Sequence, residues 1–225
     1  MAWSPGWAIP SAPRLPGYEV AKRALDLLVS VIVLLLMAPA ILVIALAIKL
    51  DTPGPSLFVQ TRLGRGGRPF RIIKFRTMLI GATDALHQEY VVALIEGRGE
   101  TKGAVNGRRV YKLVDDDRVS RIGRFLRRTS LDELPQLVNV LVGSMSLVGP
   151  RPPLDYEVDR YGPRALGRLA VKPGLTGLWQ VSGRNALGFD RMIELDLQYV
   201  ERRSLGLDLW ILARTIPAVL RPNGS

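Results

Sequence analysis

Two adjacent carboxylates, Asp132 and Glu133, are the side chains of this sequence best suited to catalysis. Neighbours on a helix point about 100° apart, so the two would not duplicate each other's role. One could attack an electrophile while the other holds a metal ion. Taken alone, the pair favours a purely structural interpretation, because the segment Ser130–Glu133 (SLDE) fits a capping box and acidic residues favour the first helical turn.

Basic residues surround this pair. Arg151 follows it within the motif GPRP at 149–152, where rigid prolines fix the direction of the side chain. Guanidinium groups bind phosphate and keep a nearby aspartate ionised, as a nucleophile requires. The pattern predicts a phosphoryl-transfer site, although several of the preceding arginines could instead form a basic surface facing solvent or lipid headgroups. The preceding arginines are Arg121, Arg124, Arg127 and Arg128. Of these, we assign Arg127 to phosphate binding.

Composition narrows the chemistry further. The sequence has no cysteine, which excludes thiol nucleophiles and Cys-ligated metal, and its single histidine, His87, argues against a His-based metal site or a Ser-His-Asp triad. Thirty-one Lys and Arg against 20 Asp and Glu give a net charge of +11, which indicates a polyanionic partner. Nucleic acid is one such partner, but nucleic-acid binding gives no reason for the apolar segment of the chain.

That apolar segment covers residues 27–48 without a charge and is long enough to span a bilayer as a helix. Pro39 lies near its middle, where a kink or break is expected. Lys22 and Arg23 precede the segment, and Lys49 and a series of arginines follow it. Because basic flanks stay on the cytoplasmic side, these features favour a re-entrant helix that returns to the same face. A single spanning helix that tolerates the proline is the alternative.

Local patterns predict a hairpin and a helix that would position the chemistry. Two β-prone runs, 57–63 and 69–76, flank the glycine-rich residues 64–67, which is the signature of a β-hairpin. Apolar residues at helical spacing predict a helix that begins near 130–132 and ends at Gly143. Its proline at position 135 would then lie in the first turn, and the two carboxylates would lie at a helix N-terminus.

Two further helices are expected at the end of the chain, over residues 189–203 and 205–220. The second is apolar but is interrupted by Asp208, Arg214 and Pro217, so it suits an interfacial or packing role better than a membrane span.

With these motifs in place, the sequence resembles the bacterial sugar transferases, the monotopic polyprenyl-phosphate phosphoglycosyl transferases. The resemblance covers nearly all of residues 21–203. The matching blocks are KRALDLL before the proline-interrupted apolar segment, DTPGPSLFVQTRLGRGGRPFRIIKFRTM, RIGRFLRRTSLDELPQLVNVLVGSMSLVGPRPP and VKPGLTGLWQVSGRN.

The resemblance implies a mechanism. Asp132 would attack the β-phosphate of a UDP-sugar, releasing UMP and leaving an aspartyl-phosphosugar that polyprenyl phosphate then attacks. Glu133 would help to hold Mg²⁺. The resemblance also associates Lys74, Arg151 and Asp196 with the active site, and it implies a re-entrant helix broken at the position of Pro39.

We therefore predict a helix-rich α+β fold, with a re-entrant membrane helix, one β-hairpin and amphipathic interfacial helices around a single catalytic domain. Residues 1–20 are expected to be an irregular lead-in, 21–50 the membrane hairpin and 51–225 the catalytic domain on the cytoplasmic face of the bacterial inner membrane. The expected enzyme transfers a sugar-1-phosphate from a UDP-sugar to undecaprenyl phosphate and so initiates exopolysaccharide, capsule, O-antigen or other glycan assembly.

Several alternatives accompany this prediction. A non-enzymatic, membrane-anchored basic scaffold would explain the charge and the apolar segment, but not the carboxylate pair and its arginines. Membrane lipids are expected partners, nucleic acid is not, and a homo-oligomer is compatible with the sequence. The chain could be a small family member or the catalytic part of a longer protein.

Overall fold

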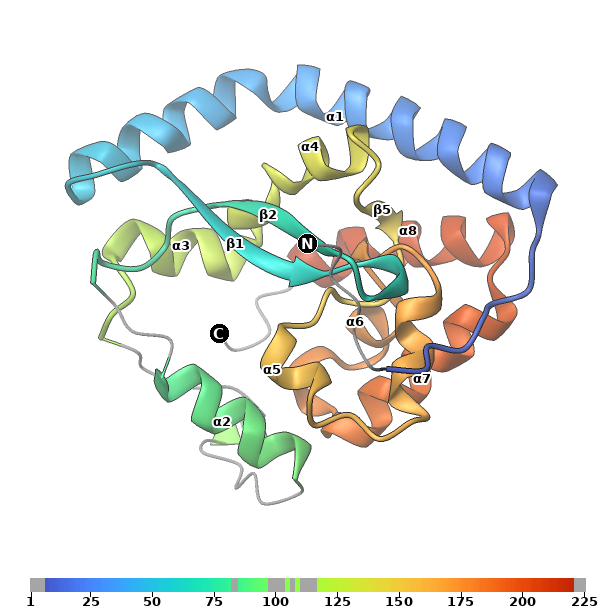
Figure 1. Ribbon diagram of the computed structural model, residues 1–225. Helices are drawn as coiled ribbons and strands as arrows, with labels where there is room; N and C mark the ends of the chain where they lie inside the picture. The colour runs from blue at the N-terminus through green and yellow to red at the C-terminus, as the bar shows by residue number, and fades with distance from the viewer. Residues whose placement is uncertain (1–6, 82–84, 97–103, 106–107, 110–116, 221–225) are drawn as a thin grey trace, which may run out of the picture.

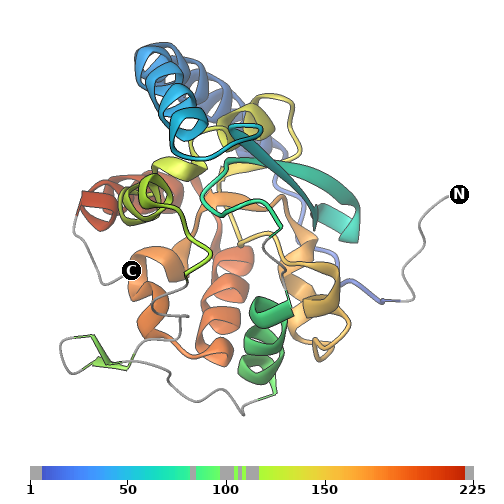
Figure 2. The same ribbon diagram turned by 90° about the vertical axis from the view of Figure 1, so that its left-hand side faces the viewer.

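The structure is a computed structural model that describes residues 7–81, 85–96, 104–105, 108–109 and 117–220. One long helix, α1 (Pro16–Asp51), arches over the remainder of the chain (Figure 1). Seen from the side, α1 remains at one end of the molecule, and α2 (Ala85–Ile95) lies at the opposite end (Figure 2). The predicted helix-rich α+β class is confirmed.

Helix α1 begins and continues differently from the prediction. It starts at Pro16 rather than at residue 21, because a proline is favoured in the first helical turn, where its missing N–H costs nothing. It also continues through Pro39 as one helix of 36 residues, about 54 Å long at 1.5 Å per residue. The expected break into two separate helices is therefore absent, and Figure 1 shows a broad arc instead. Re-entry into a membrane stays a prediction.

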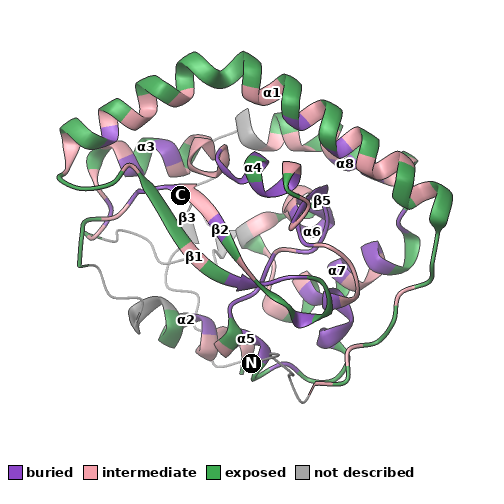
Figure 3. Ribbon diagram, turned by 45° about the horizontal axis from the view of Figure 1, so that its top comes forward, coloured by how far each residue is buried: buried purple, intermediate pink, exposed green. Residues whose placement is uncertain are grey.

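The outer face of α1 is apolar and exposed. By length and composition the helix could cross a membrane: its most apolar 18-residue window has a mean hydropathy of 3.2, and only 6% of that window is buried. Figure 3 shows exposed residues along most of the arc. A core helix of a soluble protein would be mostly buried, so the exposure of this face agrees with a membrane-associated helix.

Both ends of α1 are attached to the same domain. Near its start, Arg23 donates hydrogen bonds to the carbonyls of Val140 and Leu141, at 2.6 and 2.7 Å, in helix α4 (Gln136–Leu141). Near its end, Ile48 packs in a buried cluster with Phe75 and Leu126. The helix is thus held along its length rather than projecting from the domain.

The predicted hairpin is confirmed. Strands β1 (Leu57–Leu63) and β2 (Pro69–Phe75) pair antiparallel, joined by the short 3-10 turn η1 (Arg65–Gly67). Gly66 has φ +68°, which favours glycine. The amides of Gly64 and Gly67 bond within the turn itself, so the glycine-rich segment serves the hairpin.

Two further strand pairs were not predicted. Strand β5 (Ser146–Val148) pairs in parallel with β6 (Gly174–Thr176), and two-residue strands β3 (Ala104–Val105) and β4 (Arg108–Arg109) pair with each other. Such short strands carry no alternation that periodicity could detect.

The remaining helical segments connect and cover these strands. Helices α7 and α8 match the predicted ranges to within one residue. The segments are α3 (Arg121–Thr129), η2 (Leu131–Glu133), α5 (Asp155–Val158), η3 (Ala165–Ala170), α6 (Leu178–Ser182), η4 (Arg184–Ala186), α7 (Phe189–Arg202) and α8 (Leu205–Leu220).

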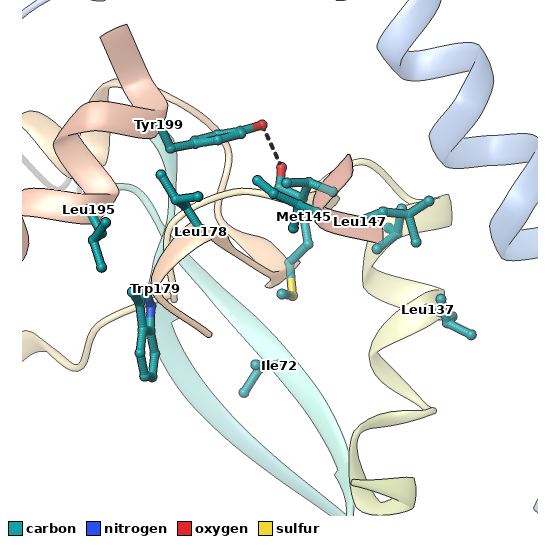
Figure 4. Close-up of a cluster of buried hydrophobic side chains, with 11 residues drawn as sticks. Ile72, Leu137, Met145, Leu147, Leu178, Trp179, Leu195 and Tyr199 are labelled. Carbon is teal, nitrogen blue, oxygen red and sulfur yellow. Dashed lines mark hydrogen bonds between the residues drawn. The ribbon is translucent and has the colours of Figure 1, made fainter. Parts of the chain in front are cut away.

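The main core joins the strands to α4, α6, α7 and α8 (Figure 4). Met145 and Leu147 enter it from the β5 region, and Trp179 and Leu195 from α6 and α7. The hydroxyl of Tyr199 donates to the carbonyl of Val148 at 3.0 Å, which ties α7 to β5. This core forms the rigid support for the loops that carry the predicted site.

Candidate functional site

The carboxylate pair lies in a tight turn rather than at the start of a helix. Asp132 and Glu133 belong to η2, and α4 begins only at Gln136 with Pro135 as its N-cap. Ser130 adopts the left-handed conformation with φ +55°, and its side chain makes no capping hydrogen bond. The capping-box interpretation is therefore wrong, and the predicted helix start is four to six residues early.

A buried asparagine brings this turn beside the hairpin. Asn139 in α4 donates from Nδ2 to the carbonyl of Arg71 at 2.7 Å and accepts from the amide of Ile73 at 3.1 Å. These bonds hold α4 against the free edge of β2. Lys74, the next residue of β2, then places its Nζ 3.6 Å from Oε1 of Glu133. The structure thus unites a lysine and a carboxylate pair that are about sixty residues apart in sequence.

Of the four arginines in α3, Arg127 faces the site. A Cβ on Gly123 would overlap the backbone of Thr77, so this glycine permits α3 to pack directly on the strand end. One turn later, Nε of Arg127 donates to Oγ1 of Thr77 at 2.9 Å, and its charge acts on Asp132. The other three arginines of α3 are exposed, as the alternative of a basic surface anticipated.

The electrostatics of Asp132 reflect both burial and its neighbours. Burial, together with the adjacent charge of Glu133, raises the pKa of Asp132 to about 6, while Lys74 and Arg127 oppose this increase. Burial lowers the pKa of Lys74, whereas Glu133 raises it. At neutral pH the Asp132 carboxylate is ionised but poorly solvated, which is the condition of an activated nucleophile.

The loop that carries Arg151 is fixed from several sides. Arg62 donates to the carbonyl of Pro152 at 3.2 Å, and Arg168 donates to the carbonyl of Arg151 at 3.3 Å. The amide of Leu63 bonds to the carbonyl of Pro153 at 3.0 Å. The backbone of GPRP therefore has little freedom, and the Arg151 guanidinium, 38% exposed, projects from a rigid support.

Behind this loop lies a buried ion network that the sequence analysis did not identify. Glu157, 2% exposed, has Oε1 at 3.7 Å from Arg151 and 3.9 Å from Arg62. Its Oε2 accepts from the hydroxyl of Tyr161, which in turn accepts from Arg168. Glu157 thus pairs with the arginine expected to bind phosphate. Its only sequence signal is an acidic residue six positions after Arg151 in a short helix.

Asp196 belongs to the same network, which corrects its expected role. The residue is fully buried and pairs with Arg168. It is therefore placed behind the site, where it holds Arg168 and through it the Arg151 loop, rather than at a surface that a substrate could touch. Unlike Asp196, the other predicted site residues all have partly exposed side chains; they are Lys74, Arg127, Arg151, Asp132 and Glu133.

Arg184 is a further cation whose charge interacts with Glu133, and the sequence analysis missed it. Burial lowers the pKa of Arg184, and the charge of Glu133 opposes this decrease. Arg184 has φ +48° in the turn after α6, and its Nε donates to the carbonyl of Gln180. The motif VSGRN contains it, but nothing in its spacing relates it to Glu133.

The carboxylate pair is also suited to a divalent cation. Within the described residues, no group of three or more acidic, His or Cys side chains gathers into a metal-binding cluster. Mg²⁺, however, commonly uses one or two carboxylates and completes its shell with water and substrate phosphates. The negative charge of Glu133 raises the pKa of Asp132, and a cation bound between the two carboxylates would offset this repulsion.

The apolar residues that flank the pair point to the long helix. Leu131 and Leu134, on either side of Asp132 and Glu133, pack against the cluster that contains Ile48 of α1. The polar turn therefore lies beside the C-terminal end of α1, the helix whose outer face is apolar and exposed.

Comparison with known proteins identifies the family of the chain. The family model described as bacterial sugar transferase matches residues 17–222. The chain is 41% identical over 207 residues to galactosyl transferase CpsE of Streptococcus agalactiae, with 92% of this chain and 43% of the relative covered. It is 40% identical to the exopolysaccharide production protein ExoY of Rhizobium meliloti, with 92% and 88% covered.

A third relative has a more specific name. The chain is 42% identical over 223 residues to a UDP-glucose:undecaprenyl-phosphate glucose-1-phosphate transferase of Caulobacter vibrioides, with 95% of this chain and 74% of the relative covered. The chain spans less than half the length of the streptococcal relative. Its match to the family model over most of its length shows that the chain belongs to the bacterial sugar transferase family.

Proposed function

We propose that the protein transfers a sugar-1-phosphate from a UDP-sugar to a polyprenyl phosphate, most simply undecaprenyl phosphate, at the cytoplasmic face of the bacterial inner membrane. The product would initiate the assembly of an exopolysaccharide or a related glycan. The observation that carries the proposal is the position of Asp132, a poorly solvated carboxylate beside Lys74 and Arg127 and next to the apolar helix. The name of the Caulobacter relative supports this reaction class, and that of the Rhizobium relative supports a role in exopolysaccharide production.

In the first step, an oxygen of the Asp132 carboxylate attacks the β-phosphorus of the UDP-sugar. The bond between that phosphorus and the bridging oxygen breaks, UMP leaves with the bonding electrons, and a sugar phosphate remains on Asp132 as an acyl phosphate. Lys74, Arg127 and Arg151 offset the negative charge of the diphosphate as it develops. Arg184 is placed to act on the same anion.

Glu133, with Asp132, would hold Mg²⁺, which supplies charge neutralisation of the diphosphate and of the leaving UMP when bound. Glu133 itself contributes a partly exposed carboxylate, 35% exposed, that Lys74 holds from one side. It can therefore face the donor without leaving its support.

In the second step, a phosphate oxygen of the polyprenyl phosphate attacks the phosphorus of the acyl phosphate. The phosphorus–carboxylate bond breaks, Asp132 is regenerated, and the sugar diphosphate of the lipid is formed. Because the lipid phosphate stays at the headgroup level while UDP-sugar is soluble, a site beside a membrane-embedded helix can meet both. Leu131 and Leu134 supply that connection.

We further propose that α1 enters and leaves the membrane on one face, with Pro39 at its deepest point. Support comes from its attachments: Arg23 bonds α4 near the start of the helix, and Ile48 packs on α3 and β2 near its end. The chain has no cysteine, so Val20→Cys and Thr52→Cys provide unique labels. Both should react with an impermeant thiol reagent from the cytoplasmic side only, whereas labelling from opposite sides would establish a spanning helix.

The reaction is tested by UMP release from the purified full chain in nanodiscs with Mg²⁺, undecaprenyl phosphate and a panel of UDP-sugars. Asp132→Asn should lower the rate by roughly 10³-fold or more, since it removes the nucleophile. Glu133→Gln should also lower it strongly, and Asp190→Asn, an exposed acid in α7, is the matched control. A donor labelled in its β-phosphate should leave label on the protein when no acceptor is present.

The outcomes separate the proposal from its rival. Full UMP release by Asp132→Asn would contradict the role of this carboxylate. No release with any donor, from protein that is folded and bound to membranes, would favour the non-enzymatic scaffold.

A further inference from the structure

A second basic site lies near the start of α1, away from the carboxylate pair. A small pocket of about 40 Å³ is formed between the first turns of α1, the hairpin turn η1, strand β5 and the end of α7. None of the site residues described above lines it. Its basic lining residues are Lys22, Arg23, Arg65, Lys172 and Arg203.

The carboxylates in this pocket are already engaged. Oδ1 of Asp26 accepts from the Ser146 hydroxyl and the Leu147 amide at 3.1 and 3.0 Å. Glu19, the other acid of the lining, lies 3.9 Å from Arg203. Neither acid therefore serves as a close partner for the remaining cations.

Two of the five cations pair with carboxylates of the chain. The other three make no ion pair with a described carboxylate. Lys22 pairs with Asp208 at 2.9 Å, and Arg203 bonds to backbone carbonyls as well as approaching Glu19. Arg23 bonds only the carbonyls that end α4, which carry no full charge. Arg65 and Lys172 make no hydrogen bond or ion pair with any part of the chain that the structure describes.

Lys172 and Arg23 converge on one point. A Cβ placed on Gly143 would lie 3.5 Å from Nζ of Lys172 and 3.6 Å from Nη2 of Arg23. Burial lowers the pKa of Lys172 and the charges of Arg23 and Arg65 lower it further, while Asp26 and Glu19 oppose this decrease without reversing it. Cations that converge in a partly buried pocket repel one another, so an anion bound there would lower the free energy of the folded chain.

We propose that this pocket, at Arg23, Arg65 and Lys172, binds a phosphate group. The three side chains offer ammonium and guanidinium donors, which match the acceptor oxygens of a phosphate. An anionic phospholipid headgroup or a soluble phosphate could supply this group. The headgroup is favoured by position, because Val20, 73% exposed, and Leu28, 60% exposed, begin the apolar face of α1 on the same helical turns.

The test compares two double variants of the full chain with equal changes in net charge. Arg65→Gln with Lys172→Gln removes the pocket cations, and Arg160→Gln with Arg164→Gln removes two exposed arginines beside α5 and η3. One arm measures the melting temperature in detergent as inorganic phosphate replaces chloride at constant ionic strength. The other arm measures binding to vesicles of phosphatidylcholine and of equimolar phosphatidylcholine and phosphatidylglycerol.

The pocket variant should lose the phosphate-dependent rise in melting temperature and most of its preference for phosphatidylglycerol, by at least about tenfold, because each basic side chain near an anionic surface contributes roughly fivefold. Loss of the phosphate effect alone would assign the site to a soluble phosphate. Equal behaviour of the two double variants in both arms would overturn the proposal. Both readouts are independent of turnover, and UMP release by the pocket variant reports separately on the proposed reaction.

Discussion

The outer face of α1 and the interior behind the carboxylate pair distribute their side chains in opposite ways. Helix α1 exposes large apolar residues such as Leu35, Leu36 and Leu42, each at least 70% exposed. The interior behind the GPRP loop instead buries charged residues, among them Glu157, Arg168 and Asp196. In a water-soluble protein both regions would be costly, since apolar patches associate and buried ions lose hydration.

The cost of the buried charges and the cost of the exposed apolar surface are offset in different ways. The buried ions are matched within the chain, because Glu157 faces two arginines and Arg168 pairs with Asp196. The apolar face of α1 has no such match in the described residues, and its length and composition suit a membrane. The buried charges therefore find opposite charges within the chain, whereas the apolar face of α1 is suited to association with a lipid phase.

The largest expected effect on this contrast is a charge on the apolar face. Leu35→Asp places a carboxylate near the middle of α1, where insertion into a bilayer costs about 2.5–3.5 kcal/mol. We expect binding of the purified full chain to phosphatidylcholine vesicles to fall by roughly a hundredfold in a flotation assay. The fold should persist, because the side chain is 71% exposed and packs on little of the domain.

Val59→Asp is the matched control, since it adds the same charge to an exposed apolar residue of β1, outside α1. Equal losses in the two variants would mean that general surface apolarity, rather than the face of α1, determines membrane binding.

A smaller effect is expected from pH. Asp132 must be ionised to attack phosphorus, and its pKa is raised to about 6, chiefly by burial. The value of kcat/KM for UMP release should therefore fall as pH decreases through about 6, approaching tenfold per pH unit, as it does for an essential base of the free enzyme. A profile that stays flat through this region would contradict the raised pKa. In Glu133→Gln, residual activity should show its inflection at lower pH, because one cause of the shift is removed.

The sequence predicted those parts of the fold that depend on local patterns. The hairpin, α7 and α8 each combine a periodic run with a clear turn signal, and their bounds agree with the structure to within one residue. The turn at Asp132 was predicted less well, because a left-handed Ser130 separates α3 from η2 and Pro135 delays the start of α4. A serine in the left-handed conformation has no reliable sequence signal.

Residues that act through long-range contacts could mostly not be predicted from local sequence patterns. Lys74, Arg127 and Arg151 were identified by resemblance or by charge. The structure places Lys74 beside Glu133, the charge of Arg127 acts on Asp132, and Arg151 pairs with Glu157. Glu157 and Arg184 were missed because their contacts cross elements that no local pattern relates. Asp196 was associated with the right region, but only its burial reveals that it acts behind the site.

The smallest expected effect tests whether the buried network serves the site through Arg151. In Glu157→Gln, the carboxylate that faces Arg151 at 3.7 Å loses its charge, so the guanidinium becomes less well oriented toward the donor. We expect KM for the UDP-sugar to rise by roughly tenfold, with a smaller change in kcat. This factor corresponds to the loss of about one charged hydrogen bond between Arg151 and a phosphate of the donor. Asp159→Asn, an exposed acid at the end of α5, is the control.

A double-mutant cycle distinguishes this positioning role from a general loss of stability. If Glu157 acts through Arg151, the effect of Glu157→Gln on KM should largely disappear when Arg151→Gln is already present, because the side chain to be oriented is gone. A purely structural role would instead add to the effect of Arg151→Gln and would lower the melting temperature of both backgrounds alike. The same network would then stabilise the fold, and the orientation of Arg151 would depend on the backbone bonds from Leu63, Arg62 and Arg168 alone.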